Sequence, residues 1–397
     1  MKGKRPFKSI SVSNILSFGP DGVNIDLEPL NVLVGPNGSG KSNFLEVFRL
    51  LQSTPHDLVE HIVGSGGLGA WQWSGPENGE STIKSQTELI DWNENPWDDI
   101  TYVHELTISP RSHIYLHESI RKCLKGREDV MYDGPIRPKM MAYNSVTEVY
   151  EPRVIKADGL KRDQSILSQR NDPDAFGYIS ALSEFYANSR IYGSVILGPS
   201  TPARLQQKAD LDGSFLFEDG SNLALVLNDL QNRPDAINAI VEYLKLFSPR
   251  IENFVTRVSY GLVQVYMHEK GLANTVPATR LSDGTIRFLA LLTILCHPTP
   301  PPLICVEEPE LGMHPDIIPT IGDLLIEASN RTQLIVTTHS DLLLSRFQDL
   351  PEAVLVCERA ENGTTMHRPD PDMLSERLRD KSLGEIWLQG AIGGTRW

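Results

Sequence analysis

The 397-residue sequence predicts an α/β fold in which one central sheet is assembled from both ends of the chain. Short apolar runs that end in polar loops occur at residues 30–34, 301–306 and 333–337, and such runs are typical of buried strands. Between them, residues 82–155 alternate apolar and polar side chains, which favours an antiparallel sheet, and residues 160–250 show helical spacing. We therefore expect a mixed central sheet, an antiparallel β subdomain and a helical lobe.

The first elements are expected close to the N-terminus. Strands are predicted around residues 10–12, 23–27 and 31–34, and the first helix at 42–52. Residues 57–80, which are rich in Gly and Trp, are interpreted as an ordered loop.

Later elements complete the predicted organisation. Strand patterns return at residues 251–269, and a hairpin with an Asn362-Gly363 turn is expected near the end. We divide the chain into an N-terminal core part, an inserted β and helical lobe, and a C-terminal core part. These segments are residues 1–81, 82–270 and 271–397.

The loop after the first apolar run matches the phosphate-binding pattern G-x-x-x-x-G-K-S at every fixed position. Its glycines allow backbone amides to turn towards phosphate oxygens, and the N-terminus of the following helix attracts anions. We expect Lys41 to reach the β- and γ-phosphates of a nucleotide, and Ser42 to ligate Mg²⁺. The predicted nucleotide-binding residues are Gly35, Pro36, Asn37, Gly38, Ser39, Gly40, Lys41, Ser42 and Asn43.

Two carboxylates end the second apolar run. At a strand end beside a triphosphate, one carboxylate can hold Mg²⁺ through water and the next can polarise the attacking water. We assign Glu307 to the metal and Glu308 to the water; an acidic pair that merely caps the following helix is the alternative. His339 follows the third apolar run and can donate a hydrogen bond to the γ-phosphate.

A polar turn opens an apolar helix shortly after residue 280. Ser282 is expected to be the N-cap of this helix, and the exposed amides behind it form a second anion site. Ser282 and Gly284 are therefore candidate anion-binding residues, although an ordinary capped helix would show the same pattern.

These motifs, in this order, resemble those of the ATP-binding-cassette ATPases, specifically the head domains of the chromosome-maintenance (SMC) and RecF-like group. Residues 281–285, Leu-Ser-Asp-Gly-Thr, take the place of the signature sequence. They differ from the commoner signature Leu-Ser-Gly-Gly-Gln, and this Leu-Ser-Asp-Gly-Thr form resembles that of a branch of ATPases labelled as AAA domains. Residues 308–315, 382–388 and 393–397 resemble the same branch. The metal-side carboxylate of the group is usually Asp, whereas this chain has Glu307.

The resemblance implies an enzyme that hydrolyses ATP with the help of Mg²⁺. The residues that would carry this activity are Lys41, Glu308 and His339 for catalysis, and Ser42 and Glu307 for the metal.

The resemblance also implies an ATP-dependent homodimer. Ser282 and Gly284 of one copy would contact the γ-phosphate held by the phosphate-binding loop of the other. A glutamine that links the metal to the helical lobe is implied as well, and Gln72, Gln86 and Gln169 remain open candidates.

Bulk composition restricts the class of protein further. The net charge of −14 disfavours a protein that coats nucleic acid by itself. No apolar run approaches the roughly 20 residues that span a bilayer, and the four cysteines form no C-x-x-C pair. We therefore expect a cytoplasmic protein that does not enter a membrane. No sustained heptad pattern is present, so no long coiled coil is predicted.

Three biological roles remain open. The first is an ATPase that switches a partner acting on DNA, for example a nuclease, in DNA repair or defence against phage. The second is a nucleotide-dependent clamp or scaffold that binds DNA directly, which the acidic charge disfavours. The third is an ABC transporter motor, which the Leu-Ser-Asp-Gly-Thr signature and the missing membrane domain disfavour.

Overall fold

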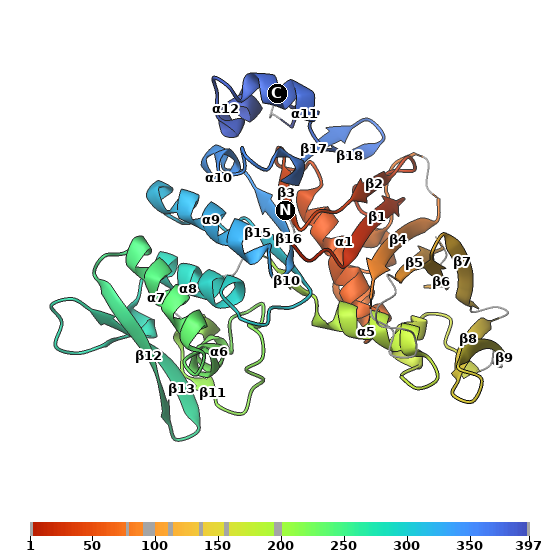
Figure 1. Cartoon of the computed structure of the whole chain (residues 1–397), viewed down its shortest axis with the longest axis horizontal. Helices are drawn as coiled ribbons and strands as arrows, with labels where there is room; N and C mark the ends of the chain where they lie inside the picture. Colours follow the sequence, from red (N-terminus) through yellow and green to blue (C-terminus); the bar gives the residue numbers. More distant parts are fainter. Residues whose placement is uncertain are drawn as a thin grey trace.

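The computed structural model describes residues 3–76, 79–89, 100–109, 114–134, 138–154, 159–193 and 201–394. Figure 1 shows a central sheet, an antiparallel sheet on one side of it and a helix-rich lobe on the other. The predicted α/β class with these three parts is confirmed. Over the described ranges the longest helix has 14 residues, so no long coiled coil is present there, and none of those helices is long and apolar enough to cross a bilayer.

The central sheet has six strands, and five of them are parallel. Only the last strand, which returns through the predicted hairpin, is antiparallel. The order across the sheet is β10 (Arg190–Tyr192), β15 (Leu303–Glu307), β16 (Gln333–Thr338), β3 (Leu30–Val34), β17 (Val354–Ala360) and β18 (Gly363–His367). Because parallel strands end at the same edge, the phosphate-binding loop, the acidic pair and His339 all emerge at one edge of this sheet.

Alternate residues of the central strands enter two different hydrophobic cores. Val32, Val306 and Val336 face the core shared with the helix-rich lobe, whereas Cys305 and Cys357 face the core around α1 (Lys41–Ser53) and α5 (Gly177–Asn188). Both cysteines are fully buried with free thiols, as expected of small core residues. Burial on both faces explains why these strands are continuous apolar runs.

The antiparallel sheet combines strands from both sides of residue 81. Because β1 pairs with both β2 and β4, the first strands of the chain are part of the same eight-stranded sheet as the insertion. In spatial order the strands are β2 (Val23–Asp26), β1 (Phe7–Ser13), β4 (Ser81–Glu88), β5 (Thr101–Ile108), β6 (Leu116–Leu124), β7 (Arg127–Gly134), β8 (Lys139–Asn144) and β9 (Val149–Val154).

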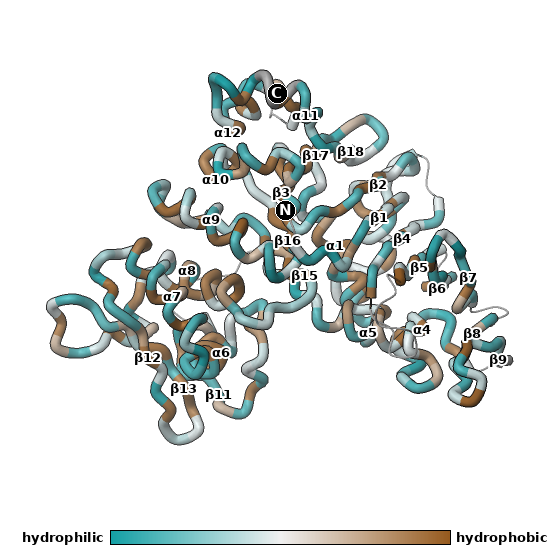
Figure 2. Tube along the Cα trace, in the orientation of Figure 1, coloured by the Kyte–Doolittle hydropathy of each residue, from teal (hydrophilic) through white to brown (hydrophobic). Residues whose placement is uncertain are grey.

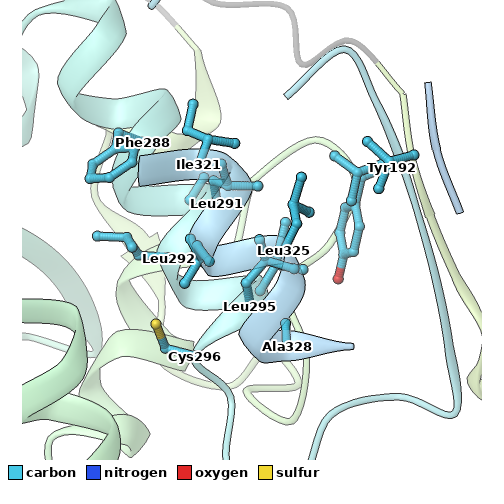
Figure 3. Close-up of a cluster of buried hydrophobic side chains, with 14 of the residues drawn as sticks. Tyr192, Phe288, Leu291, Leu292, Leu295, Cys296, Ile321, Leu325 and Ala328 are labelled. Carbon is cyan, nitrogen blue, oxygen red and sulfur yellow. The ribbon is translucent and has the colours of Figure 1, made fainter. Parts of the chain in front are cut away.

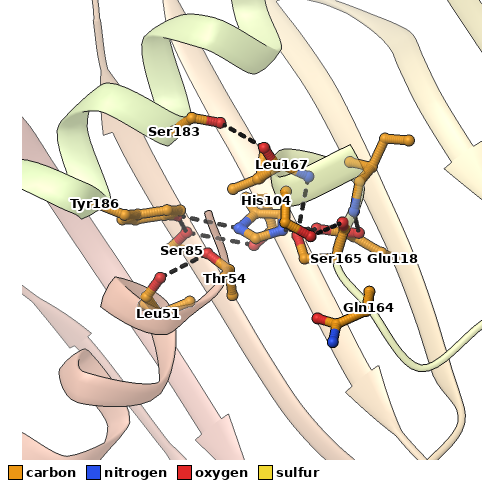
Figure 4. Close-up of polar contacts among 12 residues, drawn as sticks. Leu51, Thr54, Ser85, His104, Glu118, Gln164, Ser165, Leu167, Ser183 and Tyr186 are labelled. Atoms are coloured by element: carbon orange, nitrogen blue, oxygen red, sulfur yellow. Dashed lines mark hydrogen bonds and ion pairs between the residues drawn. The ribbon is translucent and has the colours of Figure 1, made fainter. Parts of the chain in front are cut away.

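A buried polar network joins this sheet to α4 (Ile166–Gln169) and α5 (Figure 4). His104 Nε2 lies 2.8 Å from Glu118 Oε1, and its Nδ1 lies 3.1 Å from the Tyr186 hydroxyl of α5. Glu118 also accepts hydrogen bonds from the Ser165 hydroxyl and the amide of Ile166, at 2.7 and 2.6 Å. The group is closed to solvent, so it holds the sheet against α5, which in turn packs on α1.

The helix-rich lobe is built around α8 (Asp283–Leu295), the helix that the predicted signature opens. Figure 2 shows α8 as a largely hydrophobic segment, and in Figure 3 its side chains pack against α9 (Ile318–Ala328) and Tyr192 of the central sheet. The other main elements of the lobe are α6 (Leu223–Leu230), α7 (Pro234–Phe247), β12 (Ile251–Ser259) and β13 (Leu262–Glu269), with the short strands β11 (Gln207–Lys208) and β14 (Val276–Pro277) beside β13.

Two expectations from the sequence are wrong. Residues 57–80, interpreted as a loop, contain the helices α2 (Leu58–Gly64) and α3 (Leu68–Trp71), because Asp57 caps α2 by accepting a hydrogen bond from Glu60 N. The helical interpretation of 160–250 missed β10, a three-residue edge strand too short to show a period.

The chain closes with small helices beside β17 and β18 (Figure 1). They are α10 (Asp341–Ser345), α11 (Pro371–Arg377) and α12 (Leu383–Leu388). After α12, Gly394 donates a hydrogen bond to Glu358 and packs near Gly35. The last three residues of the tail that carries part of the resemblance, 395–397, lie outside the described residues.

Candidate active site

The phosphate-binding loop connects β3 to α1 with a positive φ at its three glycines, Gly35, Gly38 and Gly40. Gly40, the N-cap of α1, has φ of 104°, and a Cβ there would lie 2.2 Å from the Thr364 hydroxyl. Only glycine fits this position. The first helical hydrogen bond of this turn runs from Phe44 N to Gly40 O at 2.9 Å, so the amides of residues 41–43 in the first helical turn have no acceptor within the helix and can bind an anion.

The side chain of Lys41 folds back against the phosphate-binding loop. Its Nζ donates to the carbonyls of Gly35 and Pro36, at 2.8 and 3.0 Å, and the side chain is buried. Burial lowers the pKa of Lys41 from its ordinary value, and the nearby carboxylates of Glu308 and Glu307 oppose that shift. A phosphate group in the loop would supply a stronger acceptor for the same ammonium group.

Ser42 and Glu307 are in direct contact. The Ser42 hydroxyl donates a hydrogen bond to Oε1 of Glu307, which joins the start of α1 to the end of β15. The longer glutamate therefore reaches the serine that the motif assigns to the metal. One hydroxyl and one carboxylate leave room for phosphate oxygens and waters, the ligand set that Mg²⁺ prefers, so the residues fit this ion. No group of three or more His, Cys, Asp or Glu side chains suited to a metal occurs in the described ranges.

Glu308 and His339 face one another across adjacent strand ends. His339 Nε2 lies 3.3 Å from Glu308 Oε1. Glu308 has φ of 44°, an uncommon conformation for a residue with a side chain, and its amide donates to Thr337 O at 3.0 Å. Because of this turn, Glu308 does not continue the regular alternation of side chains along β15. The two consecutive glutamates therefore have different partners: Glu307 contacts Ser42, and Glu308 lies beside His339.

A cavity of about 260 Å³ brings Lys41, Ser42, Glu308 and His339 together, whereas Glu307 lines a smaller neighbouring pocket that it shares with Glu308. The residues that line the cavity are Asn37, Gly38, Gly40, Lys41, Ser42, Asn43, Glu308, His339 and Arg359. A larger groove of about 810 Å³ is lined by residues such as Lys4, Pro302 and Arg331, which precede β15 and β16. It therefore lies at the opposite edge of the central sheet and is separate from the candidate site.

Arg359 is a member of this cavity that the sequence reasoning missed. It is exposed near the end of β17, which pairs with β3 on the side opposite to β16. The only signal in the sequence was its position on the predicted hairpin strand. Recognising it required the knowledge that this strand is a neighbour of the phosphate-binding loop.

The signature residues do not line the cavity of their own chain. Ser282 caps α8 as expected, because its hydroxyl accepts from Thr285 N at 3.1 Å. Arg204, which the sequence did not single out, is buried beneath this turn; it pairs with Asp283 and donates to the carbonyls of Ala278 and Leu281. The contacts of Arg204 therefore hold this turn in one conformation at the surface of the protein.

None of the three candidate glutamines lines the cavity. Gln169 instead donates to the carbonyls of Lys161 and Gln164, Gln72 belongs to a bridge with Ile15, and Gln86 lies in β4. At the edge of the central sheet, a Cβ at Gly193 would lie 3.7 Å from Glu307 Oε2. The chain after Gly193, residues 194–200, lies outside the described residues.

Known proteins give an independent comparison. A family model described as "AAA domain, putative AbiEii toxin, Type IV TA system" matches residues 30–134 and 151–345, which is more than half of the chain. The structure is similar to an Smc head bound to the C-winged helix domain of ScpA, with a TM-score of 0.57 and 14% identity over 92% of this chain and 98% of that one.

A second solved structure gives the same result. It is an Smc head domain with an extended coiled coil from Pyrococcus furiosus, bound to the C-terminal domain of ScpA. The TM-score is 0.54 at 13% identity, over 94% of this chain and 98% of that chain. At such identities the likeness shows a shared fold, and the family model shows membership. The chain therefore belongs to the AAA_21 family of AAA-domain ATPases, and its fold is that of the Smc head domains.

Proposed function

We propose that this protein binds and hydrolyses ATP at the cavity lined by the phosphate-binding loop, Glu308 and His339. The observation that carries the proposal is the meeting of these groups in one cavity, with His339 Nε2 at 3.3 Å from Glu308 Oε1. A phosphate-binding loop alone would indicate only nucleotide binding, whereas a carboxylate and an imidazole beside it supply groups for hydrolysis.

Each residue has a separate task in this proposal. The loop amides and Lys41 hold the β- and γ-phosphates, and Ser42 with Glu307 would hold Mg²⁺, which neutralises phosphate charge when bound. Glu308 orients and polarises the attacking water. His339 donates a hydrogen bond to the γ-phosphate and steadies Glu308.

We infer that a second copy of the chain completes the site. Ser282 and Gly284 lie outside the cavity of their own chain, yet they begin a helix whose N-terminal amides suit an anion. A homodimer would bring this turn to the γ-phosphate of the opposite copy. In this arrangement, residues 1–81 and 271–397 form the ATPase core, and residues 82–270 carry the β and helical additions.

Closure on ATP and release after hydrolysis would switch a protein partner. The Smc heads of similar fold are bound to domains of ScpA, which supports a protein partner in general. We propose a cytoplasmic role in DNA repair or phage defence, with a nuclease as the effector; this part rests on the resemblance to the SMC and RecF-like group.

The test is ATP hydrolysis by the purified protein with and without DNA, beside Lys41→Ala and Glu308→Gln. We expect Mg²⁺-dependent hydrolysis that both substitutions reduce by about 10²-fold or more, while Glu308→Gln still binds ATP. Hydrolysis that Lys41→Ala leaves unchanged would refute the proposed site. Stimulation by DNA that falls with salt would favour direct DNA binding, and indifference to DNA would favour a protein partner.

A further inference from the structure

One carboxylate ties together the two strand ends that carry the candidate catalytic groups. Glu310 follows β15, and its Oε1 accepts a hydrogen bond from the Thr338 hydroxyl and another from the amide of His339, the latter at 3.2 Å. The Thr338 hydroxyl in turn accepts from Ser340 N at 3.0 Å. A single oxygen of Glu310 therefore fixes the backbone from which His339 leaves β16.

The carboxyl group has little freedom to move. The Oε2 atom of Glu310 is inaccessible to solvent and has no hydrogen-bond partner among the described residues. Since a packed interior has discrete arrangements and does not deform continuously, a displacement of the Glu310 backbone would be passed on to the atoms that its side chain holds.

The backbone after Glu310 lies against the signature helix of the same chain. The guanidinium group of Arg287, on α8, donates to the carbonyl of Leu311 at 2.7 Å. A Cβ at Gly284 would lie 3.6 Å from the carbonyl oxygen of Gly312. The first turns of α8 and the loop after Glu310 are thus in direct contact.

We propose that Glu310 is a positioning residue that couples the signature helix to His339 within one chain. When a partner copy engages the first turn of α8, Arg287 and the loop move with it, and Glu310 resets the amide of His339. The imidazole and Glu308 are 3.3 Å apart, so a small backbone shift changes their contact. The inference rests on the proposed function and adds that dimer contact controls hydrolysis from inside the chain.

Three variants separate this role from a structural one. Glu310→Gln keeps an acceptor for Thr338 and His339, and Glu310→Ala removes it. Thr338→Val removes the hydroxyl, and with it the contacts to Glu310 and to Ser340 N, but keeps the contact between Glu310 and the amide of His339. For each variant, ATP hydrolysis is measured at saturating ATP, the affinity for a fluorescent ATP analogue is measured separately, and melting is recorded as a control.

We expect Glu310→Ala to lower kcat about ten- to a hundredfold while nucleotide affinity changes less than about threefold, because misplacement affects the hydrolytic step. Glu310→Gln should keep most of the activity, and Thr338→Val should lie between the two. Unchanged kcat in Glu310→Ala, or an equal loss of affinity and kcat, overturns the proposal. If the wild-type protein does not hydrolyse ATP, the proposed function is refuted. The positioning role of Glu310 is then tested by the NMR signal of the His339 imidazole, which is assigned by comparison with His339→Gln. This signal should shift in Glu310→Ala but not in Glu310→Gln, and an unchanged signal in Glu310→Ala overturns the positioning role.

Discussion

At the residue scale, the candidate site separates the two groups that we propose to act on the γ-phosphate from a third group that lines the same cavity. Glu308 and His339 leave β15 and β16, on one side of the phosphate-binding loop. Arg359 leaves β17, on the other side. The strand order therefore predicts that Arg359 contributes to nucleotide binding and not to the hydrolytic step.

The substitution Arg359→Ala tests this separation. We expect the KM for ATP to rise about three- to tenfold, with kcat nearly unchanged, because an exposed charge-assisted contact to the nucleotide is lost. Steady-state hydrolysis over a range of ATP concentrations measures both constants. Arg359→Lys, which keeps the charge, should recover part of the affinity; a fall in kcat at unchanged KM would contradict the assignment.

At the element scale, the first turn of α8 is held by a buried guanidinium group from a distant part of the chain. The side chain of Arg204 is 4% exposed, whereas that of its partner Asp283 is 61% exposed. Loss of the arginine therefore removes a donor from the carbonyls of Ala278 and Leu281, while the aspartate can be solvated. We therefore expect loss of the Arg204 side chain to alter the conformation of the turn more than the overall stability of the protein.

For Arg204→Met we expect a loss of about 1–3 kcal/mol in the free energy of unfolding. ATP binding to the monomer should be unchanged, because the cavity is built from other elements. Dimer formation with ATP should be weakened in the Glu308→Gln background, which gel filtration measures. Weaker ATP binding by the monomer itself would show that the turn and the cavity are not independent.

The same helix is anchored to its lobe by stacked rings. Phe288 of α8 is fully buried, and its ring centroid lies 4.8 Å from that of Phe247 in α7. Phe288→Ala should reduce the free energy of unfolding by about 3–5 kcal/mol, since it removes a large buried side chain and leaves a cavity. Urea unfolding measures the change, and a loss below about 1 kcal/mol would mean that the lobe repacks around the gap.

Elements with a complete local signal were predicted correctly, and elements defined by distant contacts were not. The phosphate-binding loop and the capped turn at Ser282 each carry their pattern within a few residues. The final hairpin is also present, but its turn is Glu361-Asn362 and not the predicted Asn362-Gly363, because Gly363 already pairs with Ala360 in the strands. Arg204 and Arg359 carry no such local pattern, because their roles depend on which strands become neighbours. The resemblance supplied a role for a glutamine, but local sequence gave no means to place it.

At the scale of the whole molecule, the proposed completion of each site by a second copy can be tested by mixing two inactive variants. Lys41→Ala and Gly284→Asp should each abolish hydrolysis. In Gly284→Asp the new carboxylate repels the triphosphate, but the variant should still fold because an acidic side chain is favourable in the first turn of a helix. In an equimolar mixture, the heterodimers contain one site with neither change, so about a quarter of the wild-type activity should return.

Gly284→Asn, of the same size but uncharged, is the matched control for this mixing experiment and should retain more activity than Gly284→Asp. If both halves of the site came from one chain, no mixture of the two variants would regain activity. The rate of hydrolysis after mixing, followed until subunits have exchanged, distinguishes these arrangements.

The strand that carries the phosphate-binding loop has consequences for how the protein is made. Residues 30–34 pair on one side with 334–338 and on the other with 354–356. The meander from β4 to β9 joins neighbours in sequence and can form early, whereas β3 must wait until its partners leave the ribosome. A chain still being translated therefore exposes an unpaired apolar strand for most of its synthesis.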